Sequence, residues 1–140
     1  MKVVIDSNVL LVAVGRRSRF RPIWQAFING DYQIVISEEI IHEYEEILNE
    51  HSAPGVAALV MEILSISPDV IYKRIYYAWN MIKSDPDDNK FFDAAVAANA
   101  DFLITNDSHF NDVLNISFPR INLISADYFL TILHDLKRQE

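Results

Sequence analysis

Residues 2–14 read KVVIDSNVLLVAV, and this stretch decides the class of fold. The part KVVID is a short run rich in β-branched side chains, which predicts a strand. The part SNVLLVAV is a compact apolar segment that Gly15 ends, and it predicts a helix. A strand that leads through a tight turn straight into a helix is typical of proteins in which strands and helices alternate.

The same alternation continues along the rest of the chain. Further helices are predicted at 22–30, 37–50, 56–66, 90–100 and 126–137, and further strands at 33–37, 102–105 and 121–125. The stretch 70–79, VIYKRIYYAW, favours a partly extended edge element. The clearest strands are continuous apolar runs, as in a mostly parallel sheet that is covered on both faces. We therefore predict an α/β fold.

Length and composition fit a single domain that spans residues 1–140. The chain has the length of a typical domain, and 51% hydrophobic residues are enough to build a core. Cysteine is absent, which excludes disulfides, thiolate metal ligands and a thiol nucleophile. The N-terminus shows neither a signal peptide nor a membrane-spanning apolar stretch. These features predict a cytoplasmic protein without membrane contact.

The charge balance argues against a protein that binds nucleic acid by bulk electrostatics. The net charge is −8, whereas such binding relies on lysines and arginines that neutralise phosphates. Four of the 12 basic residues nevertheless lie close together after the first helix, namely Arg16, Arg17, Arg19 and Arg21. This loop is either a solvated surface loop or one that binds phosphate groups.

Two acidic residues are predicted at the edge of the sheet where ligands bind in open α/β folds, beyond the carboxyl ends of the strands. Asp6 ends the first strand, and Asp107 follows the strand at 102–105. Each also has a structural interpretation. Asp6 could cap the helix that follows it, and Asp107 could form a turn through its side chain.

Glu43 borders the buried face of the helix predicted at 37–50. Its position is next to an apolar stripe that includes Ile40, Tyr44 and Ile47 at helical spacing, whereas the other glutamates of this helix lie farther toward solvent. A carboxylate at this border can reach over the sheet edge toward a cleft. A surface position on a helix rich in glutamate is the alternative.

The densest acidic cluster consists of Asp85, Asp87 and Asp88. It precedes the helix predicted at 90–100, which is apolar on nearly all sides and is therefore expected to be buried. Capping of that helix explains at least one of the three. Asp88 differs from the others because helical spacing places it in line with Phe92 and Ala95, on the packed side. A buried charge needs a partner, and only Lys83 and Lys90 are close in the chain. A bound metal ion would serve instead.

The residue types favour a hard cation that is held by oxygen, meaning Mg²⁺ or Mn²⁺. Several carboxylates converge, cysteine is absent, and the four histidines are scattered without metal-ligand spacing. Among them only His109, near Asp107, has a place from which it could touch a substrate. Cations in such sites bind phosphate oxygens and activate water, so the pattern favours phosphodiester hydrolysis.

Four segments in this order resemble the PIN domain family, and within it the VapC-like toxins of toxin-antitoxin pairs. They are VVIDSNVLL, SEEIIHEYEEIL, DPDDNKFFDAAVAANADFLITND and the closing strand INLIS. The resemblance implies a Rossmann-like three-layer α/β/α fold and a Mg²⁺- or Mn²⁺-dependent endoribonuclease. It also implies an RNA substrate, a protein antitoxin that covers the cleft, and a homodimer.

Carried over residue by residue, the resemblance gives four metal-binding and catalytic acids, namely Asp6, Glu43, Asp88 and Asp107. Asn8, Thr105 and Asn106 stand where the family often has supporting polar groups. Two departures leave alternatives open. Asp87 competes with Asp88 for the third position, and Asp93 is a further acid that a shift of helical register would bring in.

Two other functions compete with the ribonuclease. The first is a PIN-like module that binds RNA or protein and in which the acids no longer perform chemistry. The second is a phosphatase of the haloacid dehalogenase type, which also begins with an aspartate after the first strand. That chemistry needs a second aspartate two residues later, where this chain has Asn8, so we rank it last.

Overall fold

The computed structural model describes residues 1–139 and contains a parallel sheet. Its strands are β1 (Lys2–Ile5), β2 (Gln33–Ile36), β3 (Val70–Tyr72), β4 (Phe102–Ile104) and β5 (Leu123–Ile124). Their order in the sheet is β3-β2-β1-β4-β5, and each pair of neighbours is parallel. The predicted parallel sheet is therefore confirmed, with β1 at its centre.

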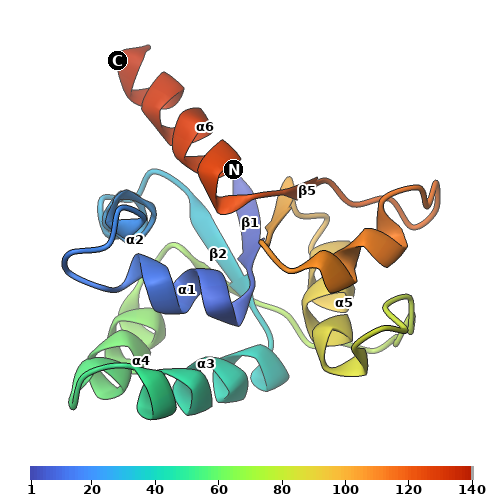
Figure 1. Cartoon of the computed structure of the whole chain (residues 1–140), viewed down its shortest axis with the longest axis horizontal. Coiled ribbons are helices and arrows are strands. Elements are labelled where there is room, and N and C mark those ends of the chain that lie inside the picture. Colours follow the sequence, from blue (N-terminus) through green and yellow to red (C-terminus); the bar gives the residue numbers. More distant parts are fainter. Residues whose placement is uncertain (140) are drawn as a thin grey trace.

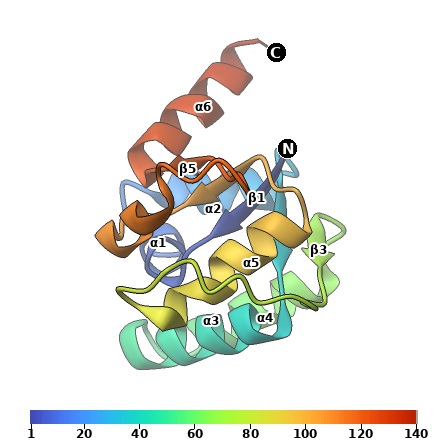
Figure 2. The same cartoon turned by 90° about the vertical axis from the view of Figure 1, so that its right-hand side faces the viewer.

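Helices connect the strands in the predicted alternation. They are α1 (Ser7–Ala13), α2 (Arg21–Ile28), α3 (Glu38–His51), α4 (Val56–Ile66), α5 (Asn89–Ala97) and α6 (Ala126–Arg138). Two 3₁₀ turns, η1 (Pro86–Asp88) and η2 (Ser108–Val113), precede α5 and follow β4. Helix α5 packs on β1, β2 and β4 on one face, while α1 and α2 lie on the other (Figures 1 and 2). The chain thus has the predicted three-layer α/β/α architecture.

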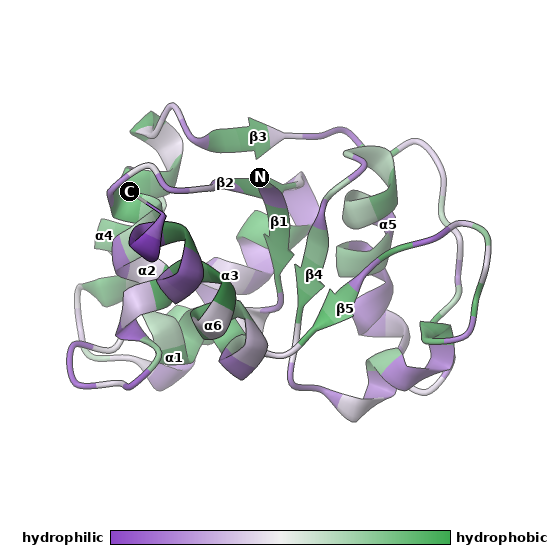
Figure 3. Cartoon of the chain, turned by 90° about the horizontal axis from the view of Figure 1, so that it is seen from above, coloured by the Kyte–Doolittle hydropathy of each residue, from purple (hydrophilic) through white to green (hydrophobic). Residues whose placement is uncertain are grey.

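The core fills the space between these layers. Strands β1, β2 and β4 are buried except for the first residue of each, and their apolar character is visible in Figure 3. Helix α5 is buried over most of its length, as its apolar composition predicted, and presents Phe91 and Phe92 to the core. The buried Tyr44 of α3 donates a hydrogen bond to the carbonyl of Ile5. This bond ties α3, and with it Glu43, to the carboxyl end of β1.

Two segments differ in detail from the prediction. Only Val70–Tyr72 of the stretch 70–79 forms a strand, which is the edge strand beside β2, and the chain then continues irregularly to the turn η1. The polar segment after β4, for which no helix was predicted, forms the 3₁₀ turn Ser108–Val113, in which Phe110 and Val113 are buried. Within residues 1–139 no helix is long and apolar enough to cross a membrane.

Candidate active site

Asp6 lies at the carboxyl end of the central strand and is only 3% exposed. Its Oδ1 accepts a hydrogen bond of 2.7 Å from the Asn8 N–H, which caps α1. Its Oδ2 accepts a hydrogen bond of 2.6 Å from the Thr105 hydroxyl at the end of β4. The capping role and the position at the sheet edge therefore apply to the same side chain.

Asp107 lies beside Asp6 because Thr105 contacts both residues. Besides its bond to Asp6, the Thr105 hydroxyl oxygen accepts a hydrogen bond of 3.0 Å from the Asp107 N–H. The Asp107 side chain caps the turn η2 by accepting a hydrogen bond of 2.9 Å from the His109 N–H. The predicted turn role of Asp107 is confirmed, and one of its oxygens remains outside this turn.

Glu43 reaches the same edge from α3. It accepts a hydrogen bond from the Ser7 hydroxyl, at the start of α1. Its Oε1 is 2.8 Å from Lys90 Nζ, and both side chains are mostly buried. Lys90 was one of the two cations expected near Asp88. It pairs with Glu43 instead and reduces the negative charge on that side of the site.

Asp88 lacks the partners that the other acids have. It lies at the junction of η1 and α5, and its side chain is 14% exposed. It makes no capping hydrogen bond to α5, and it is Asp85 that caps the preceding turn by accepting a hydrogen bond from the Asp87 N–H. The Asp88 Oδ2 is buried without any hydrogen-bond partner. Such an atom is costly to bury, and a bound cation would satisfy it.

The electrostatics show how closely the acids converge. Burial, followed by the negative charges of Asp107, Asp85, Asp6 and Glu43, raises the pKa of Asp88 from 3.8 to about 7. Burial also raises the pKa of Asp6, and the charge of Asp107 adds to this effect. The acids therefore destabilise one another when ionised. A divalent cation among them would remove this repulsion.

Two further residues belong to the cluster, and sequence reasoning did not assign them. His109 Nδ1 lies 3.0 Å from Asp107 Oδ1 and 3.6 Å from both Asp85 Oδ2 and Asp88 Oδ2. It has no hydrogen-bond partner, because its geometry toward Asp107 is not that of a hydrogen bond. Asp85, Asp88 and His109 could together hold a metal ion. The signals in the sequence were the place of Asp85 in the dense acidic cluster and a histidine two residues after Asp107.

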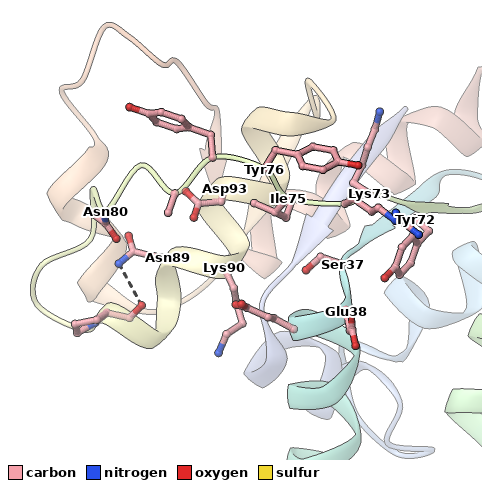
Figure 4. A pocket seen from close by; sticks show the side chains of 15 residues that line it. Ser37, Glu38, Tyr72, Lys73, Ile75, Tyr76, Asn80, Asn89, Lys90 and Asp93 are labelled. Atoms are coloured by element: carbon pink, nitrogen blue, oxygen red, sulfur yellow. Dashed lines mark hydrogen bonds between the residues drawn. The ribbon is translucent and has the colours of Figure 1, made fainter.

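The alternative acids lie outside this cluster. Asp87 is exposed, whereas Asp88 has a buried oxygen without a hydrogen-bond partner, so the arrangement favours Asp88 for the third position. Asp93 is buried, but it accepts a hydrogen bond of 3.1 Å from the Trp79 N–H, and burial raises its pKa. It faces a different groove, shown in Figure 4. The register shift that would bring Asp93 into the site does not occur.

The predicted supporting groups divide between the site and the scaffold. Thr105 joins the site as described. Asn8 contributes its backbone N–H to Asp6, while its side chain is exposed. Asn106 Oδ1 accepts a hydrogen bond of 3.0 Å from the Ala126 N–H and so fixes the start of α6. Asn106 therefore serves the scaffold at this point.

The arginine loop lies at the end of α1 that is remote from Asp6 (Figure 1). Arg19 forms an exposed ion pair of 2.5 Å with Asp127, and Arg21 donates a hydrogen bond of 2.6 Å to the carbonyl of Val14. Two of the four arginines thus have contacts within the protein. A role of this loop in RNA binding stays a prediction.

Comparison with known proteins identifies the family. A family model described as the PIN domain matches residues 2–109, most of the chain, and the chain belongs to this family. This confirms the resemblance predicted from the sequence segments. A search of curated protein sequences finds no match.

Solved structures of the same fold include two with Vap names. The first is a chain from the crystal structure of VapBC2 from Rickettsia felis, which is bound to a DNA fragment from the VapBC2 promoter. It is 15% identical with a TM-score of 0.60, and the match covers 89% of this chain and 98% of that chain. VapC20 from Mycobacterium tuberculosis, described as a sarcin-ricin loop cleaving toxin, is 13% identical with a TM-score of 0.59, covering 81% and 96%.

The fold also matches a PIN domain from a eukaryotic protein. The RRP44 PIN domain from T. brucei is 15% identical with a TM-score of 0.57, and the match covers 98% of this chain and 83% of that one. At these identities the likeness concerns the fold.

Proposed function

We propose that this PIN-domain protein is a divalent-metal-dependent endoribonuclease. The observation that carries the proposal is the partnerless, buried Oδ2 of Asp88, which lies among other carboxylates at the carboxyl edge of the sheet. Ligands bind at this edge in open α/β folds. Carboxylates without cysteine favour Mg²⁺ or Mn²⁺.

The metal would be held by Asp6, Asp88 and Asp107, and Glu43 would lie at the edge of the metal site. When bound, the metal would polarise a phosphate of the RNA backbone and lower the pKa of a water molecule. Thr105 holds the Asp6 carboxylate in place through its hydroxyl group. The ion pair with Lys90 and the hydrogen bond from Ser7 hold the Glu43 carboxylate between α5 and the start of α1.

We further propose that the protein is the toxin of a toxin-antitoxin pair. The solved structures with Vap names support this role, since one belongs to VapBC2 and the other is described as a toxin. A protein antitoxin would then cover the cleft, and the toxin would act in the cytoplasm as a homodimer. Expression of the protein alone should arrest growth, and co-expression of a small neighbouring open reading frame should restore it.

Incubation of the purified protein with RNA tests the nuclease. Structured and single-stranded RNAs are incubated with Mg²⁺, with Mn²⁺ or with EDTA. We expect internal cleavage with either metal and none with EDTA. Absence of cleavage for every RNA would contradict the proposal and favour the catalytically inactive binding module, which would still bind RNA or a protein.

Replacement of Thr105 by valine tests how Asp6 is positioned. The Thr105→Val variant loses the hydroxyl that donates to Asp6 and accepts from the Asp107 N–H, at nearly unchanged volume. Removal of groups that orient metal ligands typically costs about 10- to 100-fold in activity or metal affinity. We expect a loss of this size in RNA cleavage, measured at several Mn²⁺ concentrations. Thr105→Ser, which keeps the hydroxyl, should retain most activity, and equal losses in both variants would contradict the positioning role.

A further inference from the structure

Strand β3 and the segment that follows it present alternate side chains to solvent. Ile71 and Ile75 pack against the core, whereas Tyr72, Arg74 and Tyr76 are exposed. Figure 4 shows the chain stretched out here, alongside α5. In an extended chain, outward side chains recur about every 7 Å. The segment thus displays two aromatic rings with a guanidinium group between them.

The exposure of these rings is unusual for large side chains. Tyr76 is 88% exposed, and Tyr72 is 53% exposed. Tyr77 is also exposed and packs edge-on against Trp79, with ring centroids 4.6 Å apart. Exposed aromatic side chains that gather on one surface indicate a binding site. Their flat faces suit the bases of a single-stranded nucleic acid, which stack on such rings.

The charge of the segment complements a nucleic acid, although the protein as a whole is acidic. Residues 72–83 contain Lys73, Arg74 and Lys83 and no acidic residue, in a chain of net charge −8. Within residues 1–139, neither Lys73 nor Arg74 forms an ion pair. Both are therefore available to bind phosphates.

A groove runs along this segment and borders the side of the protein that carries Lys90. It has a volume of about 760 Å³ and lies between the segment on one side and α5 and the start of α3 on the other (Figure 4). Lys90 lines the groove and a neighbouring hollow that also contains Glu43. The opposite wall carries Glu38 and Glu39, which could accept hydrogen bonds from base amino groups. A strand in the groove would pass Lys90, which pairs with Glu43 of the candidate active site.

We propose that this groove binds a stretch of single-stranded RNA, with bases stacked on Tyr72 and Tyr76 and phosphates bound by Lys73 and Arg74. The inference rests on the proposed function, because the bound strand would be the RNA that the candidate active site cleaves. A protein partner would use the exposed rings as well. The unpaired cations favour RNA, because a polynucleotide supplies phosphates in series beside the bases.

Affinity for a fluorescent, unstructured RNA of 12 nucleotides tests the stacking. Anisotropy is measured in EDTA, so that no cleavage occurs, for the full-length wild type and for Tyr76→Ala and Tyr72→Ala. Loss of a stacking ring weakens binding by roughly 5- to 150-fold. Tyr76→Phe should bind like the wild type, because the ring remains. Tyr128→Ala on α6 is the matched control, since Tyr128 is also exposed and lies outside the groove.

The salt dependence of the same binding tests the phosphate contacts. Each phosphate contact on a single strand contributes about 0.7 to the slope of log K against log salt concentration. The double variant Lys73→Ala/Arg74→Ala should therefore lower the slope by about 1.4. The control variant Lys137→Ala/Arg138→Ala, at the end of α6, should leave the slope unchanged. An unchanged slope in the groove variant would overturn the assignment of these two cations.

Binding of duplex RNA of equal length distinguishes a site that stacks bases from a general cationic surface. Its bases are stacked on one another, so the duplex should bind less tightly than the single strand and should be insensitive to Tyr76→Ala. Equal binding of both RNAs, or unchanged single-strand affinity in Tyr72→Ala and Tyr76→Ala, overturns the proposal even if the enzyme cleaves RNA. Conversely, weaker single-strand binding in these variants supports the groove as an RNA-binding site even if the wild-type protein does not cleave RNA. Absence of cleavage would contradict only the proposed nuclease activity.

Discussion

The Asp6→Asn variant is expected to lose RNA cleavage by about 10³-fold or more, because it removes a proposed metal ligand. Loss of a group that only orients such a ligand costs less, about 10- to 100-fold. The fold should remain intact. Asparagine has the same size, its amide oxygen can still accept the Asn8 N–H, and burial already disfavours the charge of Asp6. The measurement is kcat on one RNA substrate with saturating Mn²⁺, together with the urea unfolding curve.

The matched control for this variant is Asp135→Asn. Asp135 is an exposed aspartate on α6 and is remote from the site. Its replacement should change neither kcat nor stability. If Asp6→Asn cleaves RNA as fast as the wild type, the observed cleavage either does not need Asp6 or comes from a contaminating nuclease, and both outcomes contradict the proposed site.

The Asp88→Asn variant is expected to be more stable than the wild type in EDTA at pH 8, although it loses activity. The pKa of Asp88 is raised in the folded protein from 3.8 to about 7, so folding favours its protonated form. The protonated Asp88 carboxyl stabilises the fold relative to the ionised form. This contribution to the free energy of unfolding is fully present below pH 3.8 and is lost as the pH rises through about 7. At pH 8 the ionised carboxylate therefore opposes folding, and asparagine removes this penalty.

The expected gain at pH 8 is about 1–3 kcal/mol. One pKa unit corresponds to about 1.4 kcal/mol, and partial solvent access reduces the full effect. Urea unfolding at pH 4 and pH 8 gives the difference between wild type and variant, which should be small at pH 4. Added Mn²⁺ should stabilise the wild type more than the variant, because only the wild type keeps the carboxylate. A variant that is less stable at pH 8 in EDTA would contradict the repulsion among the acids.

The sheet and the helices could be predicted because their sequences repeat simple patterns. The segment KVVID followed by SNVLLVAV specifies strand and helix through β-branched residues, a capping aspartate and an ending glycine. The stretch 70–79 was harder, because beyond Tyr72 buried and exposed large side chains are mixed: Ile75 and Trp79 pack against the core, whereas Tyr76 and Tyr77 are exposed. Its pattern indicated an extended edge, and the structure limits the strand to the residues that pair with β2.

The site could be predicted in part for a similar reason. Asp6 and Asp107 follow strands of a parallel sheet, so the topology alone brings them to one edge. Asp88 was distinguished from Asp87 by the helical face on which it lies. The contact of His109 with Asp85 and Asp88 was not predictable, because it depends on how a polar segment folds into the turn η2. Neither the pairing of Lys90 with Glu43 nor that of Asn106 with the start of α6 follows any periodicity.

The central claim is that the separated acids form one divalent metal site at the carboxyl edge of the sheet. Anomalous scattering from crystals grown with Mn²⁺ tests it most directly, because it locates the ion independently of activity. The account predicts a peak that contacts Asp88 together with Asp6 and Asp107, and that is absent from crystals of Asp88→Asn. A peak elsewhere on the protein, or none in the wild type at millimolar Mn²⁺, would contradict it.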